Sequence, residues 1–349
     1  MLSTDIKTYL SSEVSRVATN GCRRSNTLVN HGDVAKVFPY ISRLERQNGT
    51  FIYRKVSTVM EDTVNNGELR DSMDLIDRPT LGNDVVSMFA GTVDDTQGDI
   101  PGSDTGADTQ AKCGAAYLAT DIIAGEQTVV VDVELAKFAS GAEAFFLAGK
   151  KVRITNMPTA DSGTGTEDFV TIDTITSVVD LRVTFTTLEQ IGNNYTAGDG
   201  ESRAISIIDH GNVGCSTANY LVTHIGTGNY AFDSGAYPVI TDNKGTLDDR
   251  LLLTWLDANN FTVTGSNTGI DYGSGTFGAD FVPMNTEKSR MYFKIEAGGH
   301  SGVPEAGDTL ELDIHSAEYN TWYRLEVPVD CPSLANNKVT KVAIGESDQ

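Results

Sequence analysis

The sequence predicts an all-β protein, built from antiparallel sandwich-like or barrel-like domains with one short N-terminal helix and extended arms. Between residues 128 and 207 apolar residues recur at every second position, which is the pattern of half-buried strands. Short strand-like runs separated by turn-forming residues continue from residue 219 onward. Glycine accounts for 34 of 349 residues, which fits many tight turns. Such spacing favours a sandwich or barrel over alternating βαβ units.

The most regular part is a β module expected at residues 121–208, inserted between two flanking parts of the chain. Three strand-like runs lie within it, at 128–135, 146–157 and 167–189, and β-branched residues are frequent in each. Turn-forming sequences such as Asp161-Ser162-Gly163 separate the runs. The two flanking parts either close into one domain or stay separate.

Residues 1–48 are expected to form a relatively basic N-terminal arm that begins with a short helix. Residues 4–18 place apolar side chains on one helical stripe, at Ile6, Leu10, Val14 and Val17. Ser3 or Thr4 precedes the stripe and is a suitable N-cap. We therefore expect this helix to be the longest of the chain.

Residues 49–120 are expected to form the first part of a β domain, and residues 209–349 a C-terminal β domain. A strand-like run begins at Phe51, and the sequence Asn65-Asn66-Gly67 separates it from a second run. Asn-Gly between two strand-like runs favours a β-hairpin. A further strand is expected at 84–93.

Charge is unevenly distributed along the chain, whose formal net charge is -22. Residues 1–60 hold 9 Lys and Arg against 4 Asp and Glu, whereas the remaining residues hold 17 against 44. A basic arm and an acidic body suggest complementary docking, for example on a neighbouring copy; chance asymmetry of a soluble acidic surface is the alternative. Residues 94–112 are polar, acidic and glycine-bearing, which predicts a long exposed loop or second arm.

Several classes of partner and compartment are disfavoured. Phosphate binding needs clustered Lys and Arg, so no direct nucleic-acid ligand is expected. The N-terminal segment lacks a long apolar core and no run approaches 18 apolar residues, so neither a signal peptide nor a membrane contact is expected. The cysteines lack the spacing of a zinc or redox motif; reduced thiols are expected, with a long-range disulfide as the alternative, at Cys22, Cys113, Cys215 and Cys331.

No catalytic, cofactor-binding or metal-binding residues are predicted. Gly273–Gly278 matches the dinucleotide fingerprint GxGxxG, but Pro283 follows in place of the required helix, and residues 226–231 fail in the same way. His300 and Ser301 are adjacent, yet the GxSxG elbow of a hydrolase is absent. The other histidines are scattered and form no HExxH motif: His31, His210, His224 and His315.

Two acidic segments raise calcium binding as an alternative, because calcium takes about six to eight oxygen ligands. Their carboxylates are Asp94, Asp95, Asp99, Asp104 and Asp108 in one segment, and Asp248 and Asp249 in the other. Neither segment matches the DxDxDG loop, so solvated acidic loops without a cofactor are expected. Trp255 and Trp322 are the only tryptophans, which gives a sugar-binding groove little support.

Part of the chain resembles structural proteins of tailed bacteriophages. A β module of phage virion proteins is similar in its apolar spacing, carried here by Val152, Ile154, Val170, Ile172, Ile175, Leu181, Val183 and Phe185, and in the sequence Asn194-Tyr195-Thr196-Ala197-Gly198. Residues 49–56 (GTFIYRKV) and 79–99 (PTLGNDVVSMFAGTVDDTQGD) resemble neck and tail proteins of contractile-tailed phages. The resemblance covers about half of the chain and includes no catalytic signature.

The resemblance implies a non-enzymatic virion protein, made in the host cytoplasm, that forms a homo-oligomeric ring at the neck, collar or tail. Its partners would be copies of itself and other virion proteins of the head–tail connector or tail, with residues 1–48 and 94–112 as docking arms. One alternative is a capsid decoration protein. Others are a fibre or baseplate module that recognises carbohydrate or a receptor with calcium, and a polysaccharide-degrading enzyme whose acidic residues the fold brings together.

Overall fold

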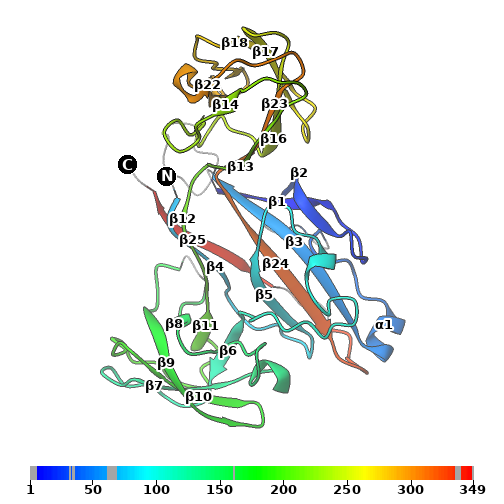
Figure 1. The fold of residues 1–349 in the computed structure, drawn as a ribbon. Helices are drawn as coiled ribbons and strands as arrows, with labels where there is room; N and C mark the ends of the chain where they lie inside the picture. Colours follow the sequence, from blue (N-terminus) through cyan, green and yellow to red (C-terminus); the bar gives the residue numbers. More distant parts are fainter. Residues whose placement is uncertain are drawn as a thin grey trace.

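The structure is a computed structural model that describes most of the chain, namely residues 6–30, 33, 36–60, 69–159, 162–334 and 339–347. Antiparallel sheets dominate it, and the described residues contain a single α-helix, α1 (Arg43–Asn48). In Figure 1 a central pair of sheets lies between a closed barrel and a further sheet at opposite ends of the molecule. The prediction of an all-β fold is confirmed.

The central unit consists of two antiparallel sheets. The larger sheet comprises, in order, β2 (Gly21–Val29), β1 (Ile6–Glu13), β3 (Thr50–Met60), β24 (Glu318–Val327) and β5 (Val85–Gly91). The smaller sheet comprises β12 (Ile208–Val213), β4 (Leu69–Ile76) and β25 (Lys341–Ser347). One hydrophobic core joins them, because Val56 and Tyr323 of the larger sheet belong to the same buried cluster as Leu75 and Ile76 of the smaller.

The predicted N-terminal helix is wrong, because residues 6–13 form strand β1. This strand pairs with β2 on one edge and with β3 on the other, so its backbone polar groups are satisfied within the sheet. Leu10, expected on the helical stripe, is instead buried in the central core. The expected arm is therefore a hairpin of the central sheet over residues 6–29, and the candidate caps Ser3 and Thr4 lie outside the described residues.

The helix that does form, α1, is short and lies later in the chain. It begins after Ser42, whose hydroxyl accepts a hydrogen bond from the Glu45 backbone, while the Glu45 carboxylate accepts one from the Ser42 backbone. This reciprocal capping box satisfies two N–H groups that the first helical turn leaves free. Glu45 also forms an ion pair with Arg16, which attaches the helix to the segment between β1 and β2.

Strands β3 and β4 do not form the expected β-hairpin. The turn sequence Asn65-Asn66-Gly67 lies outside the described residues, and the two strands belong to different sheets. β3 pairs instead with β24, from Val59 opposite Glu318 to Thr50 opposite Val327. Because β3 is buried over most of its length, its backbone N–H and C=O groups need hydrogen-bonding partners on both edges, and β1 and β24 supply them.

Residues 94–112 form a loop that packs against the central unit, although about half of its residues, such as Asp99 and Asp104, are exposed as expected. The segment returns along β5, where the backbones of Met88 and Cys113 exchange hydrogen bonds of 2.9 and 2.7 Å. Asp108 and Lys112 are fully buried and form an ion pair with each other. Because each buried charge has a partner, this polar sequence can fold inward.

A closed six-stranded barrel lies at one end of the molecule (Figure 1). Its strands are β6 (Ala115–Leu118), β7 (Thr128–Asp132), β8 (Lys151–Thr155), β9 (Glu167–Val179), β10 (Arg182–Thr187) and β11 (Arg203–Ser206), in the spatial order β10-β7-β6-β11-β8-β9. Alternate residues point inward, so that Val131, Ile154 and Phe185 are fully buried in one core. The barrel spans residues 115–206, close to the limits of the expected module.

The opposite end of the molecule is formed by residues 216–315, here called the upper unit (Figure 1). Its five-stranded sheet comprises, in order, β13 (Ser216–Thr223), β23 (Thr309–His315), β16 (Asp249–Trp255), β17 (Asn260–Gly265) and β18 (Asp271–Thr276). Three small strand pairs complete it: β14 (Ala231–Phe232) with β22 (His300–Ser301), β15 (Ile240–Thr241) with β21 (Phe293–Lys294), and β19 (Met284–Asn285) with β20 (Arg290–Met291). The core is rich in aromatic rings, including Trp255 and Phe261.

The C-terminal domain expected at 209–349 is divided between two units. Residues 216–315 form the upper unit, whereas β24 and β25 return to the central unit. β24 lies between β3 and β5, so the central sheet requires strands from both flanking parts of the chain. The barrel and the upper unit are thus both insertions in one central unit. None of the helices in the described ranges has the length and apolarity needed to cross a membrane.

Candidate functional site at the unit junctions

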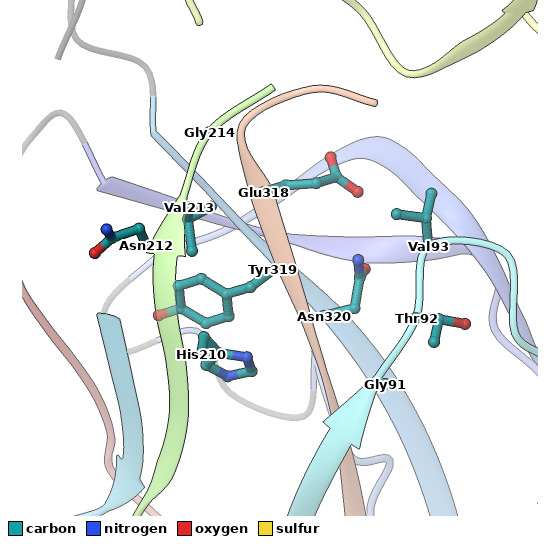
Figure 2. Close-up of a pocket in the computed structure, with 10 residues that line it drawn as sticks. All are labelled: Gly91, Thr92, Val93, His210, Asn212, Val213, Gly214, Glu318, Tyr319 and Asn320. Atoms are coloured by element: carbon teal, nitrogen blue, oxygen red, sulfur yellow. The ribbon is translucent and has the colours of Figure 1, made fainter. Parts of the chain in front are cut away.

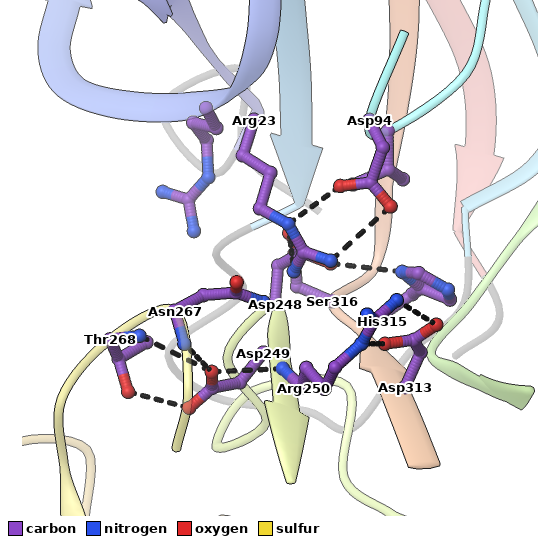
Figure 3. A network of polar contacts seen from close by, with 12 residues as sticks. Arg23, Asp94, Asp248, Asp249, Arg250, Asn267, Thr268, Asp313, His315 and Ser316 are labelled. Atoms are coloured by element: carbon purple, nitrogen blue, oxygen red, sulfur yellow. Dashed lines mark hydrogen bonds and ion pairs between the residues drawn. The ribbon is translucent and has the colours of Figure 1, made fainter. Parts of the chain in front are cut away.

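A network of charged side chains joins the central unit to the upper unit (Figure 3). Arg23 of β2 is at its centre: the Nε atom lies 2.6 Å from Asp94 Oδ1, and Nη1 lies 2.8 Å from Asp248 Oδ2. Asp94 follows β5 of the central unit, whereas Asp248 immediately precedes β16 of the upper unit. One guanidinium group therefore connects three segments that are remote in sequence. Its planar array of donors suits it to bridge two carboxylates.

His315, at the end of β23, extends this network. Its Nδ1 atom lies 2.9 Å from Asp248 Oδ1, and this hydrogen bond raises the pKa of the imidazole above its ordinary value. On the same strand, Asp313 accepts hydrogen bonds of 2.8 Å from Arg250 Nε and 2.7 Å from Asn219 Nδ2. The junction therefore contains a titratable imidazole among arginine–carboxylate pairs.

A second ion pair joins β2 to the first residue of β24. Arg24 Nε lies 3.1 Å from Glu318 Oε2, and Ser316 Oγ donates to the same oxygen at 2.8 Å. The Glu318 side chain is fully buried, and burial raises the pKa of its carboxyl group. The other oxygen, Oε1, accepts no hydrogen bond from any described residue. This leaves a buried acceptor unsatisfied, which is costly in a protein interior.

Glu318 also lines a cavity of about 300 Å³ beside this junction (Figure 2). The described residues around the cavity are Gly91, Thr92, Val93, His210, Asn212, Val213, Gly214, Glu318, Tyr319 and Asn320. The His210 ring stacks on Tyr319 with centroids 4.0 Å apart, and burial lowers the pKa of His210 to about 4. The imidazole is therefore neutral at neutral pH. This lining offers hydrogen-bonding groups but includes no cysteine, serine or lysine nucleophile.

The barrel is joined to the central unit by a more deeply buried set of charges. Arg203 of β11 donates from Nη2 to Asp77 Oδ1 at 2.8 Å and from Nε to the Asp77 carbonyl oxygen at 2.6 Å. The two side chains are 0% and 4% exposed. Arg153 of β8 lies 3.8 Å from the same carboxylate and 2.7 Å from Glu167. Two arginines of the barrel thus surround a carboxylate that follows β4.

The aspartates considered as calcium ligands do not converge on one point. Asp95 pairs with Lys55 at 2.5 Å, Asp108 pairs with Lys112, and Asp249 accepts hydrogen bonds from hydroxyl groups within the upper unit. Asp94 and Asp248 both pair with Arg23, whereas Asp99 accepts a hydrogen bond from the Thr96 backbone and Asp104 is exposed to solvent. Over the described ranges, no three His, Cys, Asp or Glu side chains are grouped so as to hold a metal ion.

The other motifs of the sequence occupy structural positions. Gly273 and Gly275 lie in β18, where a strand and a turn take the place of a nucleotide-binding helix. His300 Nδ1 is 3.0 Å from the Tyr230 hydroxyl, whereas Ser301 Oγ donates to the Ala231 carbonyl oxygen, so the two adjacent residues form no Ser–His pair. The cysteines are free thiols at Cys22, Cys113, Cys215 and Cys331, and His31 lies outside the described residues.

Sequence patterns drew attention to Asp94 and Asp248 as candidate calcium ligands, but did not show that they meet Arg23 at a junction. Arg23 and Asp248 are 225 positions apart in the chain, and Arg203 and Asp77 are 126 apart. For Arg203 a signal exists, because an arginine inside the strand-like run SRAISII has to find a carboxylate if that strand is buried. Nothing in the local sequence identifies which carboxylate that is.

The chain matches no family model, no curated protein sequence and no solved structure.

Proposed function

We propose that this chain is a non-enzymatic structural subunit of a tailed-phage virion, which assembles with copies of itself at the neck, collar or tail. The observation that carries the proposal is the way in which its β units are joined. Ion pairs attach both inserted units to the central unit, through Arg23 and Asp248 at one end and Arg203 and Asp77 at the other. Directional polar contacts fix the orientation of each unit, which suits a protein whose task is mechanical.

The sequence resemblance supports the proposal because it falls on folded β elements. The apolar spacing from Val152 to Phe185 lies in β8, β9 and β10 of the barrel. Residues 49–56 lie in β3, and residues 79–99 include β5, both in the larger central sheet. The two parts of the resemblance therefore concern the two units that share the Arg203–Asp77 junction.

Within this proposal the basic N-terminal segment has a role inside the subunit. Arg23, Arg24 and Lys55 form ion pairs with carboxylates of the same chain. Their charge is thereby neutralised, so contacts between subunits are expected on other surfaces. Removing residues 1–20 would delete β1 from the central sheet, and such a truncation would disturb folding before it reported on assembly.

Light scattering on the purified full-length chain tests the proposal. We expect one discrete species whose mass is a multiple of 37.4 kDa, and negative-stain images that show regular particles. Because the junction charges are paired within each subunit, moderate salt should leave the subunit itself folded. A single chain at every concentration and ionic strength would contradict self-assembly.

A further inference from the structure

The outer half of β9 has an open edge. From Glu167 to Thr171 this strand pairs with β8. β8 begins at Lys151, opposite Thr171, so β9 continues beyond it. Within the described part of the chain, the backbone of residues 173–179 pairs only with β10. The N–H and C=O groups along the other side of these residues therefore face no strand.

The composition of this open edge favours pairing with another strand. Residues 173–179 read DTITSVV, a segment with five β-branched residues, one charge and neither Pro nor Gly. Val178 and Val179 are 39% and 62% exposed, and Leu181 in the adjoining turn is 40% exposed. Segments of about six or seven residues with high β propensity and low charge are those that pair readily between chains.

Other sheet edges of the described structure carry features that hinder such pairing. β2 presents Arg23 and Arg24, and β5 is covered by the backbone contact between Met88 and Cys113. β18 contains two glycines, while β13, β12 and β25 each have a register irregularity. Charges, covering segments and bulges are the usual means by which proteins protect their edges. β9 shares such irregularity, because Asp173 and Thr176 are extra residues in its pairing with β10. Unlike β2 and β5, however, its residues 173–179 carry no Lys or Arg, and no described segment pairs along their open side.

We propose that residues 173–179 of two copies of this chain pair with each other as antiparallel strands, around a two-fold axis at Thr176. Antiparallel overlap places Asp173 of each copy opposite Val179 of the other, so no two carboxylates are opposed, whereas parallel overlap would place the two Asp173 side chains together. A two-fold contact is self-complementary, so a second copy of the chain is a sufficient partner. The net charge of -22 does not oppose this contact locally, because no two carboxylates face each other in it.

This contact would work by strand addition, in which backbone hydrogen bonds supply the affinity and the flanking valines exclude water. It rests on the proposed function only in that the chain assembles with itself. It adds the surface involved and a constraint on stoichiometry, because a two-fold contact implies an even number of copies in the assembly.

A charge-exchange experiment on the full-length chain tests the two-fold axis. Thr176 is exposed and opposes no residue of β10, although its hydroxyl donates to the Thr184 carbonyl oxygen, so substitution there should leave the barrel folded. Thr176→Lys places two lysines opposite each other, and self-association should weaken by at least about tenfold. Thr176→Glu should weaken it similarly, whereas an equimolar mixture should restore it because lysine then faces glutamate.

The measurements are light-scattering mass against concentration and amide hydrogen exchange of residues 173–179. The matched control is Thr164→Lys, an exposed position of the barrel in the segment before β9, which should assemble like the original chain. Circular dichroism would establish that every variant is folded.

Each result separates this inference from the proposed function. Three results together support the inference: the original chain assembles as an even multimer, each Thr176 variant alone associates more weakly, and the mixture of the two variants recovers. An assembly unaffected by either Thr176 substitution would overturn the inference and leave the proposed function standing. Weakened variants whose mixture does not recover would overturn the two-fold arrangement. A chain that never self-associates would overturn both.

Discussion

The barrel and the upper unit are both inserted into the central unit, but they are attached to it in different ways. At the barrel, Arg203 and Asp77 have side chains that are 0% and 4% exposed. At the upper unit, Arg23 is 18% exposed and shares the Asp248 carboxylate with His315, which is 20% exposed. The Arg203–Asp77 pair is buried and joins an arginine to a carboxylate, whereas the Arg23–Asp248 contact is partly exposed and includes an imidazole.

This difference in the burial of the ion pairs indicates how firmly each unit is held against the central unit. Ion pairs shielded from water are screened little by salt, whereas partly exposed pairs weaken as ionic strength rises. An imidazole changes its charge near neutral pH, and arginine does not. We therefore expect the barrel and the central unit to behave as one rigid piece, and the position of the upper unit to respond to pH and salt.

The largest effect is expected from Asp77→Asn at the barrel junction. The substitution leaves Arg203 buried without a carboxylate, whereas Arg153 loses the more distant of its two carboxylates and keeps Glu167. Breaking a buried ion pair by removing one partner costs about 3–5 kcal/mol of unfolding free energy. Urea unfolding followed by circular dichroism should show this loss, and hydrogen exchange should increase in β8 and β11.

The matched control is Asp132→Asn, which removes an exposed ion pair with Arg182 inside the barrel. Its side chain is 49% exposed, so the urea midpoint should stay unchanged. A similar loss of stability in both variants would show that the burial of the Arg203–Asp77 pair carries no special weight.

The sequence predicts strands well where alternation is long and unambiguous. Val170 and Ile172 in β9, and Val183 and Phe185 in β10, are buried as their period of two requires. The N-terminal helix failed for an identifiable reason. Ile6, Leu10 and Val14 are spaced by four residues, which places them on one side of a helix and equally on one face of a strand. Only pairing with β3, some fifty residues away in the chain, decides between the two.

The junctions were beyond the reach of sequence patterns because they depend on contacts between remote segments. The acidic residues 94–112 have the composition of an exposed loop, yet Asp108 is fully buried because Lys112 and Arg324 neutralise it. Residues 1–60 are basic in composition, but the carboxylates that pair with Arg23 and Arg24 lie in the same chain. Composition shows how many charged residues a segment has, whereas the three-dimensional fold determines which of them form ion pairs.

A smaller effect is expected from Asp248→Asn at the upper junction. Arg23 keeps its contact with Asp94, so the guanidinium retains one carboxylate after the substitution. Because the pair is partly exposed, the loss should be about 1–2 kcal/mol, between the values for exposed and buried pairs. Urea unfolding followed by tryptophan fluorescence reports on both units involved, since Trp255 lies in the upper unit and Trp322 in the central one. A loss as large as that of Asp77→Asn would contradict the contrast.

A second barrel-side group, Glu134, should give a comparable effect of the opposite sign. It follows β7 and lies against Thr80 of the central unit, 3.3 Å from its hydroxyl group. Burial raises the pKa of Glu134 to about 7, from an ordinary 4.5, and the nearby Asp84 adds to the rise. The folded state binds this proton more tightly than the unfolded state, so stability falls as pH rises from about 4.5 to 7.

Glu134→Gln removes this ionisation, because an amide stays neutral at every pH. Allowing for partial exposure, we expect the variant to be more stable by about 1–2 kcal/mol at pH 8 and nearly unchanged at pH 4.5. Thermal unfolding at the two pH values measures the difference. An equal gain at both values would assign the effect to packing rather than to charge.

The smallest effect concerns His315 at the upper junction. The hydrogen bond with Asp248 raises the pKa of its imidazole, while Arg23 opposes the protonated form and Asp313 favours it. The folded state therefore binds the proton more tightly than the unfolded state. The resulting stabilisation is fully present below the unfolded pKa of about 6.5 and is lost as pH rises through the higher folded pKa.

His315→Gln should accordingly differ from the original chain by below about 1 kcal/mol at pH 6, and this difference should shrink by pH 9. His210 and His300 titrate in the opposite sense, because burial lowers the pKa of each to about 4, but they are present in both proteins and cancel at any one pH. The readout specific to the junction is hydrogen exchange at the start of β16, next to Asp248. If hydrogen exchange there responds to pH equally in both proteins, the pH response of the upper unit does not come from His315. If the response is lost in His315→Gln, the titration of His315 at this junction causes it.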